Sequence, residues 1–183
     1  MKSTLFASAL ALALGTAAQA EPVTYVIDAS HAQIVFSYDH LGYSTTTGMF
    51  SGFEGTIAFD QDDPAASSVS VSFPVETLIT GWPAREEHLL SGDFFGADSN
   101  PEVSFVSTGI EVTGDNTGVI TGDLTINGMT QSVTLDTTMN QMGDHPMAGR
   151  PWIGFDATTT LVRSEFDMGQ FAPFVGDEVS ISI

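Results

Sequence analysis

The feature of this sequence that most restricts its fold is the strict alternation of apolar and polar residues in several separate segments. Between residues 68 and 75, Val69, Val71, Phe73 and Val75 alternate with serine and proline. The same period of two recurs in residues 34–40, 120–126, 133–139 and 179–183. Because successive side chains of a β-strand point to opposite faces, each segment is predicted to be a strand with one apolar and one polar face. Such strands are typical of antiparallel sheets.

Turn signals separate these segments at fairly even intervals. Asn127-Gly128 is typical of a two-residue hairpin, since both turn positions need positive φ angles. Residues 114–118 and 60–64 predict two further hairpin loops. The spacing accommodates roughly eight strands, which predicts a single all-β domain folded as an up-and-down barrel, with an open sandwich as the competing architecture.

One segment breaks the pattern and predicts a short helix. Residues 83–90 place Pro83 at the first helical position, with strong helix formers behind it, and Ser91-Gly92 ends them. This helix is expected to cap one mouth of the barrel. Arg85 and His88 are three residues apart and share a helical face. We expect both to hold the helix against the mouth, with Arg85 paired to an acid.

The first twenty residues have the three parts of a secretory signal peptide. Lys2 precedes an apolar run from Leu5 to Leu14, and Ala18-Gln19-Ala20 supplies the small residues of a cleavage site. The run is shorter than the roughly 20 residues that cross a bilayer. We therefore expect residues 1–20 to be removed, Glu21 to begin the mature chain, and the protein to be released into a periplasm without a transmembrane segment.

The charge of the mature chain excludes some partners. Three arginines (85, 150 and 163) face 23 acidic residues after position 20, which leaves a net charge of −20. Such a surface repels nucleic acid phosphates, because no cationic patch is available to release counterions. Cysteine is absent, so stability has to come from burial rather than from disulfides.

The usual signatures of catalysis and metal binding are missing. The four histidines match no metal template, and the calcium-like loop that begins at Asp60 has Ala65 at its sixth position instead of glycine. Asp28, Ser30 and His31 are the residue types of a catalytic triad, but sequence neighbours rarely have triad geometry. We predict no catalytic residues and no metal.

Aromatic residues are more informative, because most lie at positions of inward parity. A barrel of about eight strands either fills its interior with side chains or leaves room for one slender ligand. Alternation alone leaves both interpretations open.

A series of short motifs runs from about residue 23 to the C-terminus. In order they are Asp28-x-x-His31, Phe36-x-x-x-His40-Leu41-Gly42, Gly48-x-Phe50, Phe53-x-Gly55, Arg85-Glu86-Glu87-His88-Leu89, Asp93-Phe94-Phe95, Gly122-x-Leu124-Thr125-Ile126-Asn127-Gly128 and Arg163-x-Glu165-Phe166. Together they resemble the YceI-like family of periplasmic, lipocalin-like proteins. Two positions depart from the family pattern: Glu86 stands where Asp is usual, and Asp167 stands where Gly is common.

The resemblance implies that residues 21–183 form an eight-stranded antiparallel lipocalin-like barrel, with one or two short helices and an apolar tunnel. The tunnel would bind a polyisoprenoid, such as an isoprenoid quinone, or another long apolar lipid, for carriage or storage. No cofactor other than such a lipid is implied, and a homodimer is allowed. The alternatives are a stress-related protein with a filled barrel, and an enzyme that uses His40 or His88. The predicted ligand-binding residues are Phe36, Tyr38, His40, Phe53, Phe73, Trp82, Phe94, Phe105 and Phe155. Arg85 and His88 are predicted to be structural residues at the mouth, with contact to a ligand headgroup as the alternative role of Arg85.

Overall fold

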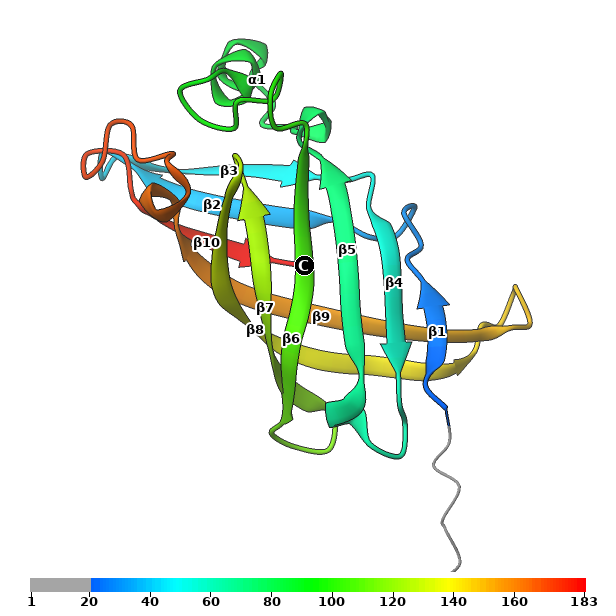
Figure 1. The fold of residues 1–183 in the computed structure, drawn as a ribbon. Helices are drawn as coiled ribbons and strands as arrows, with labels where there is room; N and C mark the ends of the chain where they lie inside the picture. Colours follow the sequence, from blue (N-terminus) through cyan, green and yellow to red (C-terminus); the bar gives the residue numbers. More distant parts are fainter. Residues whose placement is uncertain (1–20) are drawn as a thin grey trace, which may run out of the picture.

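The structure, a computed structural model, describes residues 21–183 as one antiparallel sheet that curls on itself (Figure 1). The predicted signal peptide lies outside the described residues. The strands are β1 (Val23–Val26), β2 (Ile34–His40), β3 (Ser44–Phe50), β4 (Glu54–Phe59), β5 (Ser68–Pro74), β6 (Glu102–Val112), β7 (Thr117–Ile126), β8 (Met129–Asp144), β9 (Pro151–Val162) and β10 (Glu178–Ser182). The helix α1 (Pro83–Leu90) and the 3-10 turns η1 (Pro64–Ala66), η2 (Val75–Thr77) and η3 (Arg163–Phe166) connect them.

The all-β antiparallel class is confirmed, with ten strands instead of the expected eight. They follow the order β1-β4-β5-β6-β7-β8-β9-β10-β2-β3. The sequence pattern understates the number, because β1 has only four residues and β3 is mostly Ser and Thr, so neither shows apolar alternation. Within residues 21–183 no ladder joins the edge strands β1 and β3, so the sheet is curled but not closed by hydrogen bonds.

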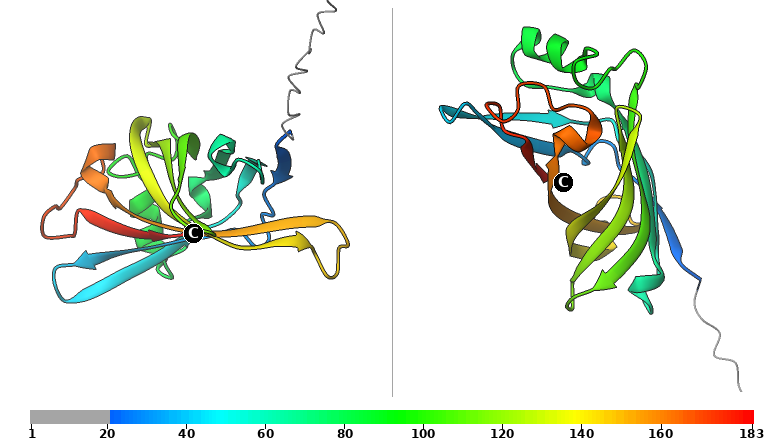
Figure 2. Two further views of the ribbon diagram at one scale, coloured as in Figure 1. Left: turned by 90° about the horizontal axis from the view of Figure 1, so that it is seen from below. Right: turned by 60° about the vertical axis from the view of Figure 1, so that its left-hand side comes forward.

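The curl places two parts of the sheet across each other. Strands β4 to β7 run upright in Figure 1, whereas β2, β3, β9 and β10 cross behind them. The long strands β8 and β9 pass from one part to the other, and their register shifts between Met139 and Gln141. Such irregularities bend strands at the corners of a curled sheet. The hairpin between β8 and β9 projects beyond the rest of the sheet (Figure 2).

The predicted faces of the alternating strands are confirmed. Val71 on β5, Ile120 on β7, Leu135 on β8 and Ile181 on β10 all line the interior of the curl. Their sequence neighbours of opposite parity do not, except Ser182 after Ile181. The predicted hairpin at Asn127-Gly128 is also present, with φ angles of 50° and 72°.

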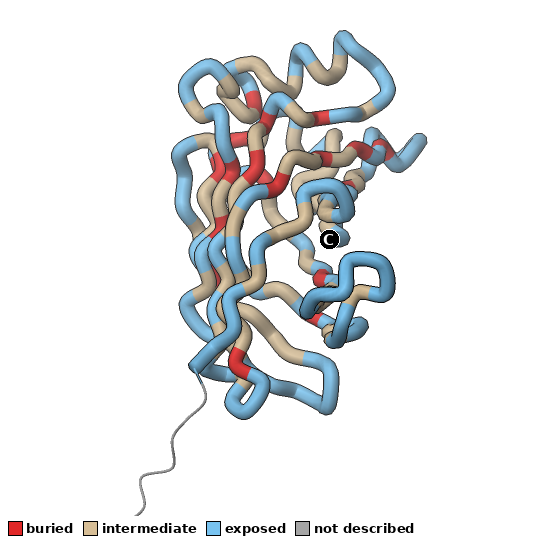
Figure 3. Tube along the Cα trace, turned by 90° about the vertical axis from the view of Figure 1, so that its right-hand side faces the viewer, coloured by how far each residue is buried: buried red, intermediate tan, exposed pale blue. Residues whose placement is uncertain are grey.

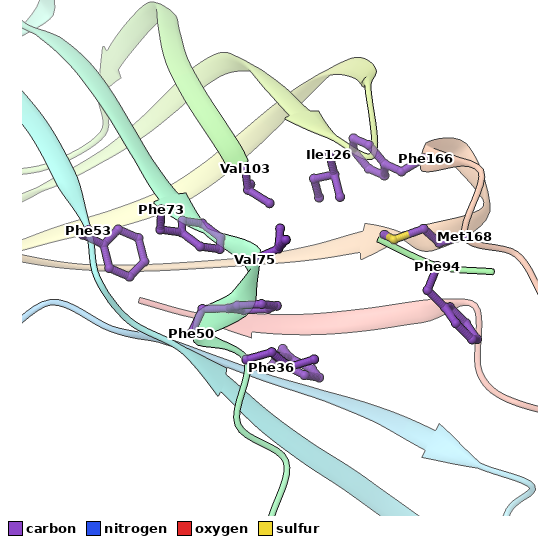
Figure 4. Packing of buried hydrophobic residues seen from close by; sticks show 11 residues of the cluster. Phe36, Phe50, Phe53, Phe73, Val75, Phe94, Val103, Ile126, Phe166 and Met168 are labelled. Carbon is purple, nitrogen blue, oxygen red and sulfur yellow. The ribbon is translucent and has the colours of Figure 1, made fainter. Parts of the chain in front are cut away.

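The packed core occupies only one end of the molecule. Its buried residues gather in the half toward α1, and most of the residues coloured as buried in Figure 3 lie in its upper half. Figure 4 shows how they converge between the strands. Phe50 is at the centre of the aromatic part: its ring centroid is 5.5 Å from Phe36, 5.1 Å from Phe73 and 5.5 Å from Phe95. The full cluster is Phe36, Phe50, Phe53, Phe73, Val75, Leu78, Phe94, Val103, Ile126, Phe166 and Met168.

Candidate binding cavity

A cavity of about 1520 Å³ follows the concave face of the sheet, and all ten strands contribute to its wall. It exceeds the roughly 300–1,000 Å³ typical of sites for drug-sized molecules. Aliphatic and aromatic side chains form most of its inner surface. The sequence allowed an interior filled with side chains, but the structure contains an open cavity instead.

The two ends of the cavity differ. One end is closed by Leu89 of α1, by Phe94 and Phe95 in the following loop, and by Phe166 and Met168 near η3, none of which is exposed. At the other end most of the lining residues are exposed; they come from residues 26–31, 114–117 and 150–151, where only Ile27 and Asp28 are half-buried. The cavity is therefore more accessible from the second end, away from α1.

Seven of the nine predicted ligand-binding residues line the cavity: Phe36, Tyr38, Phe53, Phe73, Phe94, Phe105 and Phe155. The prediction omitted Phe50 on β3, for which the Gly48-x-Phe50 motif was the available signal. It also omitted the aliphatic wall, although the alternating pattern contains it. The main aliphatic residues there are Ile57, Val69, Val71, Val103, Ile110, Ile120, Leu124, Val133, Leu135, Leu161, Val179 and Ile181.

Two predicted ligand-binding residues lie outside the cavity. His40 is exposed at the end of β2, where it pairs with Ser44 and forms a bridge to Val175. His40 lies on the same face of β2 as Phe36, as its parity predicts. However, the end of β2 that contains His40 extends beyond the cavity, together with the paired end of β3. Trp82 precedes α1 and is 62% exposed. Trp82 belongs to the loop before the helix, and the alternation of apolar residues along strands does not predict where a loop residue lies.

Two glycines allow large rings to lie against the wall. The ring of Phe36 covers Gly48 on the neighbouring strand, and an added Cβ there would lie 2.3 Å from the ring. The ring of Phe105 covers Gly122 in the same way, also at 2.3 Å. Aromatic rings that cover cross-strand glycines stabilise the pairing of the two strands.

Arg163 is the polar anchor of the closed end, a role that the sequence did not reveal. Its side chain is buried and lines the cavity. The guanidinium donates hydrogen bonds to the backbone carbonyls of Gly176 (2.8 Å), Gln170 (2.9 Å), Val175 (2.9 Å) and Met168. One side chain therefore organises the loop from Met168 to Gly176, and the rigid fork of its donors suits the task.

Asp167, where the family pattern commonly has glycine, follows η3 in the left-handed region with φ of 58°. This conformation explains the preference for glycine, while Asp is among the few other residues that tolerate it. The turn is therefore formed despite the substitution.

The capping helix is held by Glu86 rather than by Arg85. Within residues 21–183 Arg85 forms no ion pair, so the predicted pairing to an acid is wrong. The Glu86 carboxylate instead accepts hydrogen bonds from the N–H groups of Thr80 (2.7 Å) and Gly81 (3.0 Å). These bonds, first that from Thr80, lower the pKa of Glu86. His88 packs edge-on against Phe94 and Phe171, at centroid distances of 5.1 and 6.1 Å, and so links α1 to the closed end.

A small polar turn borders the open end. The Asp28 carboxylate accepts a hydrogen bond from the Ser30 hydroxyl at 2.6 Å and lies 2.7 Å from Nδ1 of His31. The Ser30 hydroxyl also approaches Nδ1, at 3.1 Å. In a catalytic triad the hydroxyl and the carboxylate meet opposite nitrogens of the ring. The three side chains therefore form a structural turn and not a nucleophile with its base.

This turn predicts an acid-dependent contribution to stability. The Ser30 hydroxyl, followed by His31, lowers the pKa of Asp28 from 3.8 to about 2. Since the folded-state pKa is the lower one, the contribution is complete above about pH 4 and is lost as the pH falls toward 2. Asp28→Asn should reduce the acid-induced drop in melting temperature across this window. Equal drops in the wild type and the variant, followed by circular dichroism, would contradict the assignment.

Comparison with known proteins agrees with this architecture. The model of the YceI-like domain matches residues 25–183. A UPF0312 protein of Pseudomonas syringae pv. syringae is 39% identical over 168 residues, which cover 91% of this chain and 87% of the relative. A UPF0312 protein of Pseudomonas putida KT2440 is 40% identical over the same coverage.

Solved structures show the same fold. The structure of BcnA from Burkholderia cenocepacia superposes with a TM-score of 0.76 at 27% identity, over 85% of this chain and 96% of that one. The YCEI protein of Campylobacter jejuni has a TM-score of 0.70 at 26% identity, over 87% and 94%. A polyisoprenoid binding domain from Saccharophagus degradans shares the fold alone, with a TM-score of 0.60 at 7% identity over 88% and 95%. On the family match and these relatives, the chain belongs to the YceI-like family.

Proposed function

We propose that this protein binds one long, flexible apolar lipid, of polyisoprenoid or isoprenoid-quinone type, and carries or stores it in a periplasm. The observation that supports the proposal most directly is the cavity of about 1520 Å³, with its apolar walls and single closed end. Burying each CH₂ group of a tail contributes about 0.8 kcal/mol, so an extended tail would bind without specific polar contacts. The Saccharophagus degradans domain indicates that this fold is compatible with such a ligand.

The other two functions have less support. A stress-related protein with a filled barrel does not need an open cavity of this size. An enzyme based on His40 or His88 would need the histidine to face the cavity, and neither residue lines it. Export to a periplasm rests on the signal peptide predicted for residues 1–20. No helix within residues 21–183 is both long and apolar enough to cross a bilayer.

Native mass spectrometry of freshly purified protein tests the proposal, with a pair of variants of matched charge. Ile120→Asp places a carboxylate in the cavity, whereas Thr121→Asp adds the same charge at a neighbouring position that does not line it. A buried unpaired charge facing an apolar tail is strongly unfavourable. We expect the wild type and Thr121→Asp to retain a lipid adduct, and Ile120→Asp to lose it by at least about tenfold.

Two results would contradict the proposal: a wild-type protein without any adduct that also fails to take up added lipid, or equal lipid occupancy in the two variants. Circular dichroism has to show that Ile120→Asp is folded. Leu135→Asn, which places an uncharged polar group on the same wall, serves as a second variant should the first fail to fold.

A further inference from the structure

The open end of the cavity contains one cation whose hydrogen-bonding capacity is unused. Residues 21–183 contain three arginines. Arg85 does not line the cavity, and the guanidinium of Arg163 donates hydrogen bonds to four backbone carbonyls. Arg150 lines the cavity and is exposed. Within the described part of the chain, its guanidinium forms neither an ion pair nor a hydrogen bond. Its five N–H donors therefore have no protein partner among the described residues.

The hairpin between β8 and β9 fixes the position of this cation. The guanidinium carbon of Arg150 lies 5.2 Å from the centroid of the Trp152 ring, a cation–π arrangement. Trp152 also lines the cavity and packs against His145, at a centroid distance of 4.7 Å. His145 Nδ1 in turn accepts hydrogen bonds from the N–H groups of Met147 and Ala148 at the hairpin tip. The hairpin tip is therefore held by hydrogen bonds to His145, the same residue that packs against Trp152.

The charges around Arg150 determine which ligand groups this end of the cavity favours. The acids that line the open end are Asp28, which lies 2.7 Å from Nδ1 of His31, and Asp115; Asp156 also lines the cavity, and none of the three acids is within ion-pair distance of Arg150. These acids disfavour an anionic ligand everywhere in the mouth except beside the guanidinium. In a chain with 23 acids and four basic residues, an arginine without an acid partner at the cavity mouth leaves its charge available to a ligand.

We propose that Arg150, held over Trp152, binds the anionic headgroup of a single-tailed lipid acid whose tail occupies the cavity. The inference rests on the proposed function and narrows it: among long apolar lipids it selects a tail that ends in a carboxylate or a phosphate, and not a quinone, whose headgroup is neutral. A carboxylate and a phosphate both present the paired acceptor oxygens that a guanidinium binds in a bidentate manner. Both headgroups therefore belong to the proposed class.

The test uses three ligands with identical tails: palmitic acid, hexadecanol and hexadecyl phosphate. The chain has two tryptophans, so Trp82→Phe leaves Trp152 as the sole tryptophan. Its fluorescence then reports occupancy of the mouth, at lipid concentrations below those at which the lipids aggregate. We expect the two acids to bind about tenfold more tightly than the alcohol, and added salt to reduce this preference.

Arg150→Gln should remove the preference, Arg150→Lys should restore part of it, and Arg85→Gln, which makes the same change of charge outside the cavity, should leave it intact. A preference for the phosphate or for the carboxylate assigns the headgroup within the proposed class. Equal binding of acid and alcohol by the wild type, or an unchanged preference in Arg150→Gln, overturns the inference while the proposed function stands. Failure of hexadecanol to bind at all counts against the proposed function itself.

Discussion

Replacing Arg163 by methionine is expected to lower the free energy of unfolding by about 3–5 kcal/mol, since it leaves backbone carbonyls without their donor at about 1–3 kcal/mol for each group that stays buried and unsatisfied. Methionine fills a similar volume but donates no hydrogen bond. The carbonyls of Met168, Gln170, Val175 and Gly176 would then lose their partner together. Denaturation in urea, followed by circular dichroism, measures the loss.

The matched control is Arg85→Met, which removes the same charge from a side chain without an ion pair. It should change stability by no more than about 0.5 kcal/mol, as surface substitutions usually do. Arg163→Lys should recover only part of the loss, because an ammonium on a flexible stem cannot match the directions of the guanidinium donors. A loss below about 1 kcal/mol in Arg163→Met would show that the loop is held by other contacts.

Replacing Gly48 by alanine is expected to reduce the lipid carried by the purified protein by about tenfold, with a loss of stability of about 1–3 kcal/mol from overpacking. The new Cβ would lie 2.3 and 2.7 Å from two atoms of the Phe36 ring. The ring therefore has to move, and the open space available to it is the cavity. Quantitative extraction and mass spectrometry of the bound lipid measure the effect.

Gly109→Ala is the control, because an added Cβ at that strand position meets no atom within 4 Å. The double variant Gly48→Ala with Phe36→Leu removes the clash and should regain most of the bound lipid. Full lipid occupancy in Gly48→Ala alone would mean that the ring moves away from the cavity.

The sequence predicts the cavity wall well, for a simple reason. Alternation fixes which side of a strand a residue occupies, so Phe73, Phe105 and Ile120 were assigned to the correct face from their parity alone. Parity carries no information about where along a strand the cavity ends. His40 therefore shares the face of Phe36 and still lies in solvent.

The alternation of apolar and polar residues does not predict the roles of residues whose contacts are made by loops. The role of Arg163 depends on four carbonyls that follow it at separations of 5 to 13 residues, and only the folded loop brings them together. The arginine of the helix motif looked like the anchor, because its spacing to His88 suits a helical face. Glu86 holds that helix instead, through N–H groups that precede it in the chain.

The two unjoined edges of the sheet have a consequence for the range of ligands. In a closed barrel the number and stagger of the strands set the diameter, so a wider guest would have to break main-chain hydrogen bonds. Here no ladder within residues 21–183 links β1 to β3, and the girth of the cavity depends on how tightly the sheet is coiled. The coil can loosen while every strand keeps its partners. Tolerance toward guests of different thickness would therefore follow from the strand order at the open end, whereas at the closed end the contacts of Phe50 with Phe73 and Phe95 hold the curl.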